Sequence, residues 1–352
     1  MDNDTRIPST PPPADAIRRK CCRGMAWGFA LLSTAALAWT GGCSHGRTET
    51  EHGDRYYTRG RLAGAARHYD RALEQDPGDA AAWRGRGNVH AEKKESGPAL
   101  DCYRRAQELA PQAPEGYYLE GVLHQEQGDA DAAIAAYGKA IACPGDYWSA
   151  RFNRGGLLLD KGDPAGALAD FDAALALRRG EWRLHVLRGR TLVALERWAE
   201  AEEEMDKALA LGAPPEVWRD RAGIRLDRGD WEGALSDAEK VLAAQPDVLN
   251  LNNMAWLLLT LPREDLRDTA RARKLMDRAR AMERKNNCVI CADILDGTQA
   301  ALAFAEGDPD RAIALLQALV DAGTAEPGEL LQLECYRQGL PFYLSASPAA
   351  TP

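Results

Sequence analysis

The sequence has few aromatic residues, which make up 7% of its 352 positions, and it has no run rich in Val, Ile and Thr. Because β-branched and aromatic side chains favour strands, their scarcity argues against a β-sheet protein. Ala dominates the apolar residues and recurs with Leu, Glu and Arg, all of which are good helix formers. The composition therefore predicts an all-α fold.

Long hydrophobic runs are also missing from the body of the chain. The segment 154–177 is rich in Ala and Leu, yet Asp160, Lys161 and Asp163 interrupt it. A helix that spans a membrane needs roughly 18 consecutive apolar residues. This segment is therefore not a membrane span.

One uncharged segment, residues 25–40, lies near the N-terminus. Basic residues within 18–23 precede it, and Gly41-Gly42-Cys43 follows it. A basic region, a short apolar region and small residues before a cleavage point are typical of a secretory signal. Small residues that lead into a Cys also resemble the bacterial lipobox. That resemblance implies that Cys43 becomes the lipidated first residue of the mature chain.

The fate of this leader has three interpretations. The resemblance favours a lipoprotein, while an uncleaved N-terminal anchor and ordinary secretion remain as alternatives. Ser44 follows Cys43 where enteric lipoproteins of the inner membrane have Asp, so the resemblance implies an outer-membrane lipoprotein that faces the periplasm. The Pro-containing head before Cys43 and the Ser/Ala/Pro tail after Tyr343 lack the patterning of folded segments.

Basic residues are in the minority. The chain has 44 Lys and Arg against 53 Asp and Glu, a net charge of −9, of which residues 1–42 contribute +2 and the remainder −11. Nucleic-acid binding depends on basic patches that neutralise phosphates, so we expect no nucleic-acid partner. An acidic chain is also repelled by anionic lipid, so any membrane attachment must come from the lipid or the N-terminal anchor.

Common catalytic motifs are absent from the sequence. It contains no H-E-x-x-H, no G-x-x-x-x-G-K-[ST], no G-x-S-x-G and no dinucleotide-binding signature. We therefore expect a protein that is not an enzyme and that has no cofactor.

What the sequence does contain is a 34-residue repeat. The spacing of Gly162, Ala167, Phe171 and Ala174 recurs earlier at Gly128, Ala133, Tyr137 and Ala140, and in part at Gly60, Ala65, Tyr69, Ala72, Pro77, Gly229, Ala234 and Pro246. A second set of large and small residues lies upstream of each shared Gly: Trp83, Gly87, Tyr117, Gly121, Gly155, Gly189 and Trp218. This pattern resembles the tetratricopeptide repeat (TPR), a helix–turn–helix unit.

The TPR resemblance implies a right-handed α-solenoid of about eight helix–turn–helix units. One helix pair cannot bury its apolar side alone, so the units must stack. The predicted segments are a leader at 1–42, repeats at 46–79, 80–113, 114–147, 148–181, 182–214 and 215–248, a seventh repeat at 249–285, an eighth at 293–326, and a C-terminal tail at 327–352. The seventh repeat carries an insert at 262–268, in its turn.

Histidines and cysteines are the candidate metal ligands of the sequence. His90 and His124 fall where the repeat has Tyr, and we interpret them as packed substitutes for Tyr, with no metal site. Cys288 and Cys291 form a C-x-x-C before a predicted helix, whose N-terminus lowers the pKa of a thiol. The βαβ setting of thioredoxin-like sites and a full set of zinc ligands are both missing. A disulfide or inert thiols are therefore favoured, with redox function as the alternative.

The TPR resemblance also implies where a partner binds, because the first helix of each repeat lines a concave groove. The residues that we predict to bind a partner are Arg84, Asn88, Tyr118, Phe152, Arg183, Arg190 and Arg219, with Val122, Leu159 and Val186 beside them. This mixture suits a peptide with acidic groups and apolar anchors, although the same residues could form a helix surface without a ligand. Leu119 stands where the carboxylate clamp of cochaperone TPR domains needs Asn, so we do not assign that clamp.

Two functions follow from these observations. The first is a non-enzymatic scaffold or adaptor, anchored in the bacterial envelope, that binds protein or peptide partners in its groove. The second is a thiol-redox or chaperone-like envelope factor that uses Cys288 and Cys291.

Overall fold

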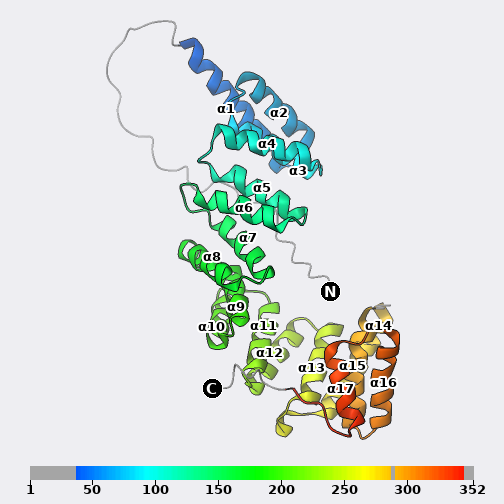
Figure 1. Cartoon of the computed structure of the whole chain (residues 1–352). Helices are drawn as coiled ribbons and strands as arrows, with labels where there is room; N and C mark the ends of the chain where they lie inside the picture. The colour runs from blue at the N-terminus through cyan, green and yellow to red at the C-terminus, as the bar shows by residue number, and fades with distance from the viewer. Residues whose placement is uncertain (1–36, 287–289, 345–352) are drawn as a thin grey trace. The chain divides into compact units, whose positions relative to one another are not determined.

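The structure, a computed structural model, describes residues 37–286 and 290–344, with side chains over 48–285 and 295–344 (Figure 1). Within these ranges it consists of 17 α-helices and one short 3₁₀ helix, with no β-strand. Consecutive helices pack against one another as pairs. The all-α prediction is confirmed.

The helices form two compact units, and the boundary between Leu157 and Leu158 lies inside α7. Unit 1 contains α1 (Leu37–Thr58), α2 (Leu62–Gln75), α3 (Ala80–Glu92), α4 (Ser96–Leu109), α5 (Pro114–Glu126), α6 (Ala130–Ala142) and most of α7 (Trp148–Asp160). Unit 2 contains α8 (Pro164–Leu177), α9 (Trp182–Ala194), α10 (Trp198–Ala210), α11 (Glu216–Asp227), α12 (Trp231–Ala244), α13 (Val248–Thr260), η1 (Glu264–Leu266), α14 (Thr269–Asn286), α15 (Ile290–Ala305), α16 (Pro309–Ala322) and α17 (Pro327–Arg337).

Paired helices are joined by short turns with one residue in the left-handed conformation. Gly162 has this conformation between α7 and α8, with φ of 80°. The next amide, of Asp163, donates to the carbonyl of Leu158 at 2.8 Å, which closes the end of α7. The Asp163 carboxylate then accepts from the amide of Gly166 at 2.9 Å and caps the start of α8. One short sequence thus ends one helix and begins the next.

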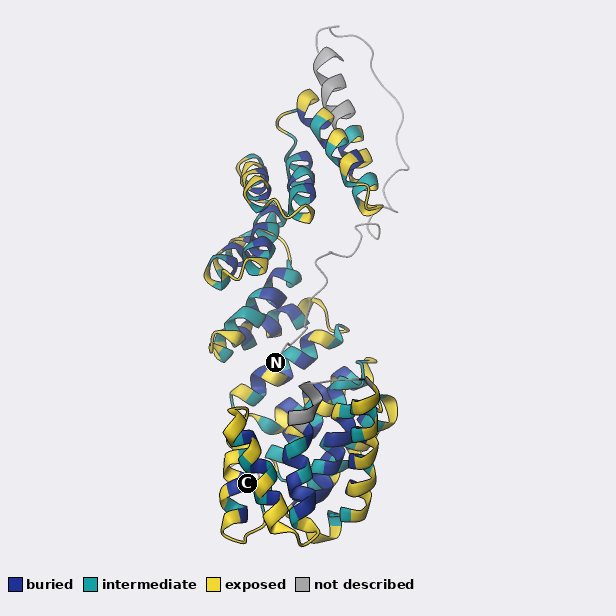
Figure 2. Ribbon diagram, turned by 90° about the vertical axis from the view of Figure 1, so that its right-hand side faces the viewer, coloured by how far each residue is buried: buried dark blue, intermediate teal, exposed yellow. Residues whose placement is uncertain are grey.

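Small residues and one ring fill the space within a helix pair. Tyr137 on α6 is fully buried between Ala133 and Ala140, which are also fully buried. A Cβ atom at position 121 would lie 2.6 Å from the Tyr137 ring, so the Gly121 backbone is what makes room for it. Figure 2 shows the resulting pattern, with buried residues along the sides of helices that face their neighbours.

The helix pair of α13 and α14 is joined by a longer connection than the others. It contains η1 and lies within 262–268, where the sequence pattern predicted an insert. The carboxylate of Asp268 accepts from the amide of Arg271 at 2.8 Å, in the first turn of α14. The amide of Asp268 donates back to the carbonyl of Leu258 at 3.1 Å, which ties the insert to α13.

The last described residues after α17 fold back onto α13 and the insert. The amide of Leu344 donates to the carbonyl of Thr260 at 2.8 Å, and the ring of Phe342 lies 5.8 Å from that of Trp256. The guanidinium of Arg267 lies 4.6 Å from the centre of the Tyr343 ring. Residues 342–344 are therefore packed against elements some 80 residues earlier in the sequence.

The leader falls mostly outside the described residues. Residues 1–36 and the side chain of Cys43 are not described, and neither are residues 345–352, so the predictions made for the leader, the head and the end of the tail lie there. Over the described ranges, no helix combines the length and the apolar character that a membrane crossing requires.

Candidate partner-binding face

In unit 1 the first helices of consecutive pairs share one surface, which we call the unit 1 face. It is made by Asn88 and Glu92 of α3 with Val122 and Glu126 of α5, which line one cavity, and by Arg84 and Tyr118, one helical turn earlier on the same two helices. Three of the predicted partner-binding residues, Arg84, Asn88 and Tyr118, belong to it. Equivalent residues of α3 and α5 are 34 positions apart, so the repeat itself places them side by side.

Tyrosine hydroxyls of the second helices donate hydrogen bonds to polar side chains of the first helices. The hydroxyl of Tyr103 on α4 donates to Oδ1 of Asn88 at 3.0 Å, and that of Tyr69 on α2 donates to Asp54 at 2.8 Å. Burial raises the pKa of both tyrosines, so their hydroxyls remain protonated donors. The hydrogen bond from Tyr103 therefore fixes the Asn88 side chain through its amide oxygen.

A cavity of about 80 Å³ opens on the unit 1 face beside Asn88. Its apolar lining includes Ala91, Leu119 and Val122, which are half-buried, while its charged lining residues Glu92 and Glu126 are exposed. The ring of Tyr57 from α1 closes one side, and its hydroxyl lies 3.3 Å from Oε1 of Glu92 as a donor. Burial and the negative charge of Glu92 raise the pKa of Tyr57 to about 12.

The other end of the unit 1 face is aromatic. The ring of Tyr118 lies 5.2 Å from that of Tyr147 and 5.7 Å from that of Tyr137, and burial raises the pKa of Tyr118. Arg84 lies close by, with its guanidinium 3.8 Å from the carboxylate of Glu115. Arg84 and Tyr118 are both partly exposed.

Phe152 is placed differently from the exposed apolar anchor that its spacing predicted. Its ring is 8% exposed and packs edge-on against Trp148 at 6.2 Å. Val186, expected beside the groove, is 7% exposed and belongs to the core of unit 2. The reason is physical: an apolar ring on an amphipathic helix gains more from packing than from solvent.

In unit 2 the three predicted arginines lie on α9 and α11. Arg190 on α9 donates to Oδ2 of Asp220 on α11 with two nitrogens, at 2.7 and 3.1 Å. The guanidinium of Arg183 lies 5.2 Å from the centre of the Trp182 ring and 3.8 Å from Glu181. Arg219 is exposed. A partner carboxylate would compete with Asp220 for Arg190.

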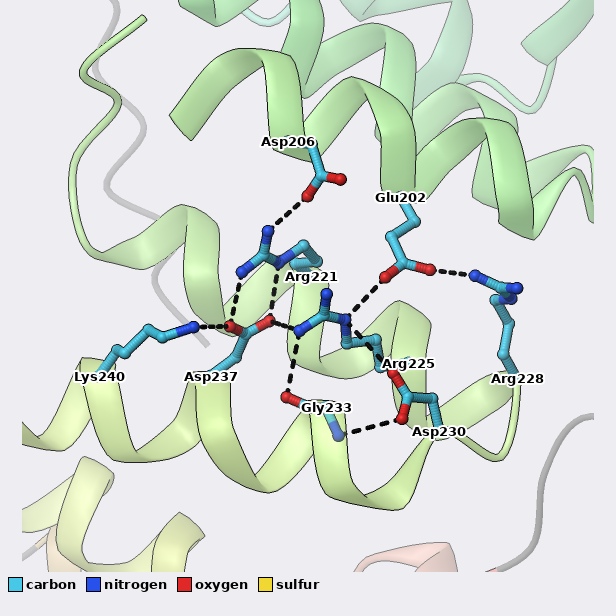
Figure 3. Close-up of polar contacts among 9 residues, drawn as sticks. All are labelled: Glu202, Asp206, Arg221, Arg225, Arg228, Asp230, Gly233, Asp237 and Lys240. Carbon is cyan, nitrogen blue, oxygen red and sulfur yellow. Dashed lines mark hydrogen bonds and ion pairs between the residues drawn. The ribbon is translucent and has the colours of Figure 1, made fainter. Parts of the chain in front are cut away.

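A denser cluster of charges joins α10, α11 and α12 (Figure 3). The Asp237 carboxylate is fully buried and accepts from Arg221 at 2.7 Å twice, from Arg225 at 2.8 Å and from Lys240 at 3.0 Å. Burial alone would raise the pKa of Asp237, but these hydrogen bonds and positive charges hold it below its usual value. Since its oxygens are occupied, Asp237 joins helices and is not available to bind or react.

The arginines that recur at one position of the repeat make ion pairs with the preceding helix. Arg86 pairs with Asp70, Arg188 pairs with Asp172 at 2.6 Å, and Arg221 pairs with Asp206. Each pair joins the first helix of one repeat to the second helix of the repeat before it. These arginines therefore connect neighbouring repeats.

Histidine and cysteine side chains form no evident reactive centre in the described part of the chain. His90 Nδ1 lies 2.6 Å from Glu95, and burial raises the pKa of the thiols of Cys102 and Cys143. No group of three or more candidate metal ligands occurs among the described side chains. Cys288 and the side chain of Cys291 lie outside the described residues, so their pairing stays a prediction.

Comparison with known families agrees with this helix-pair architecture. Tetratricopeptide repeat models match residues 50–114, 118–181 and 158–222. The chain is a TPR protein. Its TPR structure is similar to that of pilF from Pseudomonas aeruginosa, with 20% identity, a TM-score of 0.53 and coverage of 60% of this chain and 96% of that one. PilW, a type IV pilus biogenesis factor, gives 19% identity, a TM-score of 0.50 and coverage of 57% and 94%.

These likenesses concern the fold alone, because the identities are low. A comparison with curated proteins found no match. The function of this TPR protein must therefore be argued from its own residues.

Several residues that line the cavity on the unit 1 face were not predicted from the sequence to bind a partner. Tyr57, Glu92 and Glu126 line the cavity, yet none was among the predicted partner-binding residues. The signal was present, because Glu92 and Glu126 are 34 residues apart and both end a first helix. The last groove residues predicted on these two helices, Asn88 and Val122, lie four residues before them.

Proposed function

We propose that this TPR protein is a non-enzymatic scaffold that binds extended segments of protein partners on the exposed sides of its first helices. The observation that carries the proposal is the unit 1 face. It combines half-buried tyrosine rings, exposed charges and a cavity within the length of two neighbouring helices. Aromatic and apolar anchors with polar surroundings are what peptide-binding surfaces use.

Arg183, Arg190 and Arg219 of unit 2 are the residues we propose for acidic groups of a partner. Arg183 and Arg219 are exposed, whereas Arg190 must exchange Asp220 for the incoming carboxylate. Exposed ion pairs contribute only about 0–1 kcal/mol each, so the acidic preference would be carried by several arginines together. We further propose that a lipid on Cys43 attaches the scaffold to the bacterial envelope.

A peptide array tests the scaffold. The full chain, purified in mild detergent, is applied to extended peptides of varied charge and apolar content. We expect Arg183→Glu with Arg190→Glu to lose acidic peptides preferentially at low salt, where ion pairs are least screened. Tyr118→Ala should weaken binding at low and high salt alike, because an apolar contact is insensitive to salt.

The matched control is Arg104→Glu, a charge reversal on the exposed side of the second helix α4. This variant should bind as the unmodified chain does. If it loses peptides as strongly as the variants of the first helices, or if none of the variants changes binding, the proposed surface is wrong.

A further inference from the structure

The size of the unit 1 cavity decides what it can hold. Its volume is about 80 Å³. A single water needs roughly 10–15 Å³ on such a measure, whereas sites for drug-sized molecules run from about 300 to 1,000 Å³. The cavity therefore fits one side chain of a partner and not a cofactor or metabolite.

The lining then selects the type of side chain. Ala91, Leu119, Val122 and the buried Leu123 offer methyl groups to an aliphatic stem. The charged lining residues Glu92, Lys94 and Glu126 are exposed. A lysine or arginine side chain combines the same two parts, because its methylene groups bury well and its charged head stays near water.

The charges favour a cation over an anion. Glu92 and Glu126 bring two carboxylates, and Lys94 brings one ammonium group, so the lining has a net charge of −1. The Tyr57 hydroxyl donates to one oxygen of Glu92, so this donor is already used and does not offset the negative charge. A carboxylate in the same place would share the cavity with two negative groups and one positive group, which is unfavourable on balance.

We infer that the unit 1 cavity binds the side chain of a lysine or arginine of the partner segment, with its charged head between Glu92 and Glu126. The inference rests on the proposed function, since it concerns the partner of the same face. It adds a charge preference opposite to the one expected at the arginines of unit 2. A partner segment that binds unit 1 is therefore expected to contain a basic residue.

Three small probes of equal length isolate this charge preference: pentylammonium, pentanol and pentanoate. They are titrated into the full chain labelled at Leu and Val methyl groups, and NMR shifts are followed at Leu119, Val122 and Leu123. We expect pentylammonium to bind most tightly and pentanoate least. Glu92→Gln with Glu126→Gln should weaken pentylammonium roughly fivefold and leave pentanol unchanged, because two exposed ion pairs are removed.

Lys94→Gln should have the opposite effect and strengthen pentylammonium binding. The matched control is Glu74→Gln with Glu108→Gln, which removes two exposed carboxylates from the second helices α2 and α4, outside the cavity lining. This control should leave all three probes unchanged.

The outcomes separate this inference from the proposed function. Equal binding of the three probes, tighter binding of pentanoate, or shifts at methyl groups away from the cavity would overturn the inference, even where the peptide array shows binding to the unit 1 face. A preference for pentylammonium that depends on Glu92 and Glu126 supports it, even where the array variants contradict the wider scaffold proposal.

Discussion

Lys94 and Glu196 hold a backbone conformation that costs energy for any residue with a side chain. Their φ angles are 62° and 58°, at the turn position where other helix pairs have glycine. Backbone hydrogen bonds impose the geometry, for instance from the amide of Arg197 to the carbonyl of Leu192 at 2.8 Å. The packing of the helix pair therefore overrides the preference of the single residue.

Glu196→Gly should raise the free energy of unfolding by about 1 kcal/mol, because glycine adopts this conformation without the steric cost. The side chain of Glu196 is exposed, so its removal costs few contacts. Urea denaturation followed by circular dichroism measures the change. As the reciprocal control, Gly162→Ala should lower stability by a similar amount, and a lower midpoint for Glu196→Gly would contradict the account.

Sequence spacing predicts burial at single residues better than it predicts their contacts. The 34-residue spacing singled out Ala133, Tyr137 and Ala140, and all three are fully buried. It did not predict that Asn88 accepts from Tyr103, or that Arg190 pairs with Asp220, because those partners are 15 and 30 residues away. Such contacts depend on how adjacent helices align, which periodicity alone does not specify.

Between helices, one polar connection of unit 2 is made by the buried carboxylate of Asp237. It lies on α12 and binds two arginines of α11, while Arg221 also reaches Asp206 on α10. Three consecutive helices are thus joined through one buried anion. Removing one partner of a buried charge cluster is costly, since the remaining charges lose their compensation.

Asp237→Asn should destabilise the protein by about 3 kcal/mol at neutral pH. The pKa of Asp237 is lowered in the folded chain, so its contribution is complete above the unfolded value near 4 and is lost as the pH falls through the folded value. The unmodified chain should therefore lose stability below about pH 4 more steeply than the variant. Urea midpoints at several pH values between neutral and 3 give both quantities.

Asp206→Asn is the control for this prediction, because the Asp206 side chain is 54% exposed and also pairs with Arg221. It should cost less than about 1 kcal/mol. Equal losses in the two variants would mean that burial does not set the importance of Asp237.

The helices themselves were predictable to different degrees. The insert between α13 and α14 could be located because Ala272, Met276 and Ala279 arrive four residues late, and all three are buried. Helix α17 and the packing of Phe342 against Trp256 could not be predicted. They belong to one short helix and a Pro-containing segment that do not match the repeat pattern. The cavity was missed for a related reason: it exists only between helices that have already stacked.

For the molecule as a whole, the prediction to test is the lipid on Cys43. Cys43→Ala should abolish lipid labelling and leave unprocessed precursor if Cys43 is the lipidated residue. Metabolic labelling with a fatty acid, followed by mass spectrometry of the mature N-terminus, measures both. Ser44→Ala serves as the control and should be labelled normally. Persistent labelling of Cys43→Ala, or a mature chain that begins elsewhere, would refute the lipoprotein prediction.

The return of residues 342–344 onto α13 changes how the last described repeats can open. In a linear array each repeat contacts only its neighbours, so the terminal one can fray while the rest stays folded. Here the contacts of Phe342, Tyr343 and Leu344 with Trp256, Arg267 and Thr260 close a ring of elements from α13 to the tail. A ring has no free end from which unfolding can start, so we expect the described elements from α13 to Leu344 to unfold more cooperatively than an open array of repeats does.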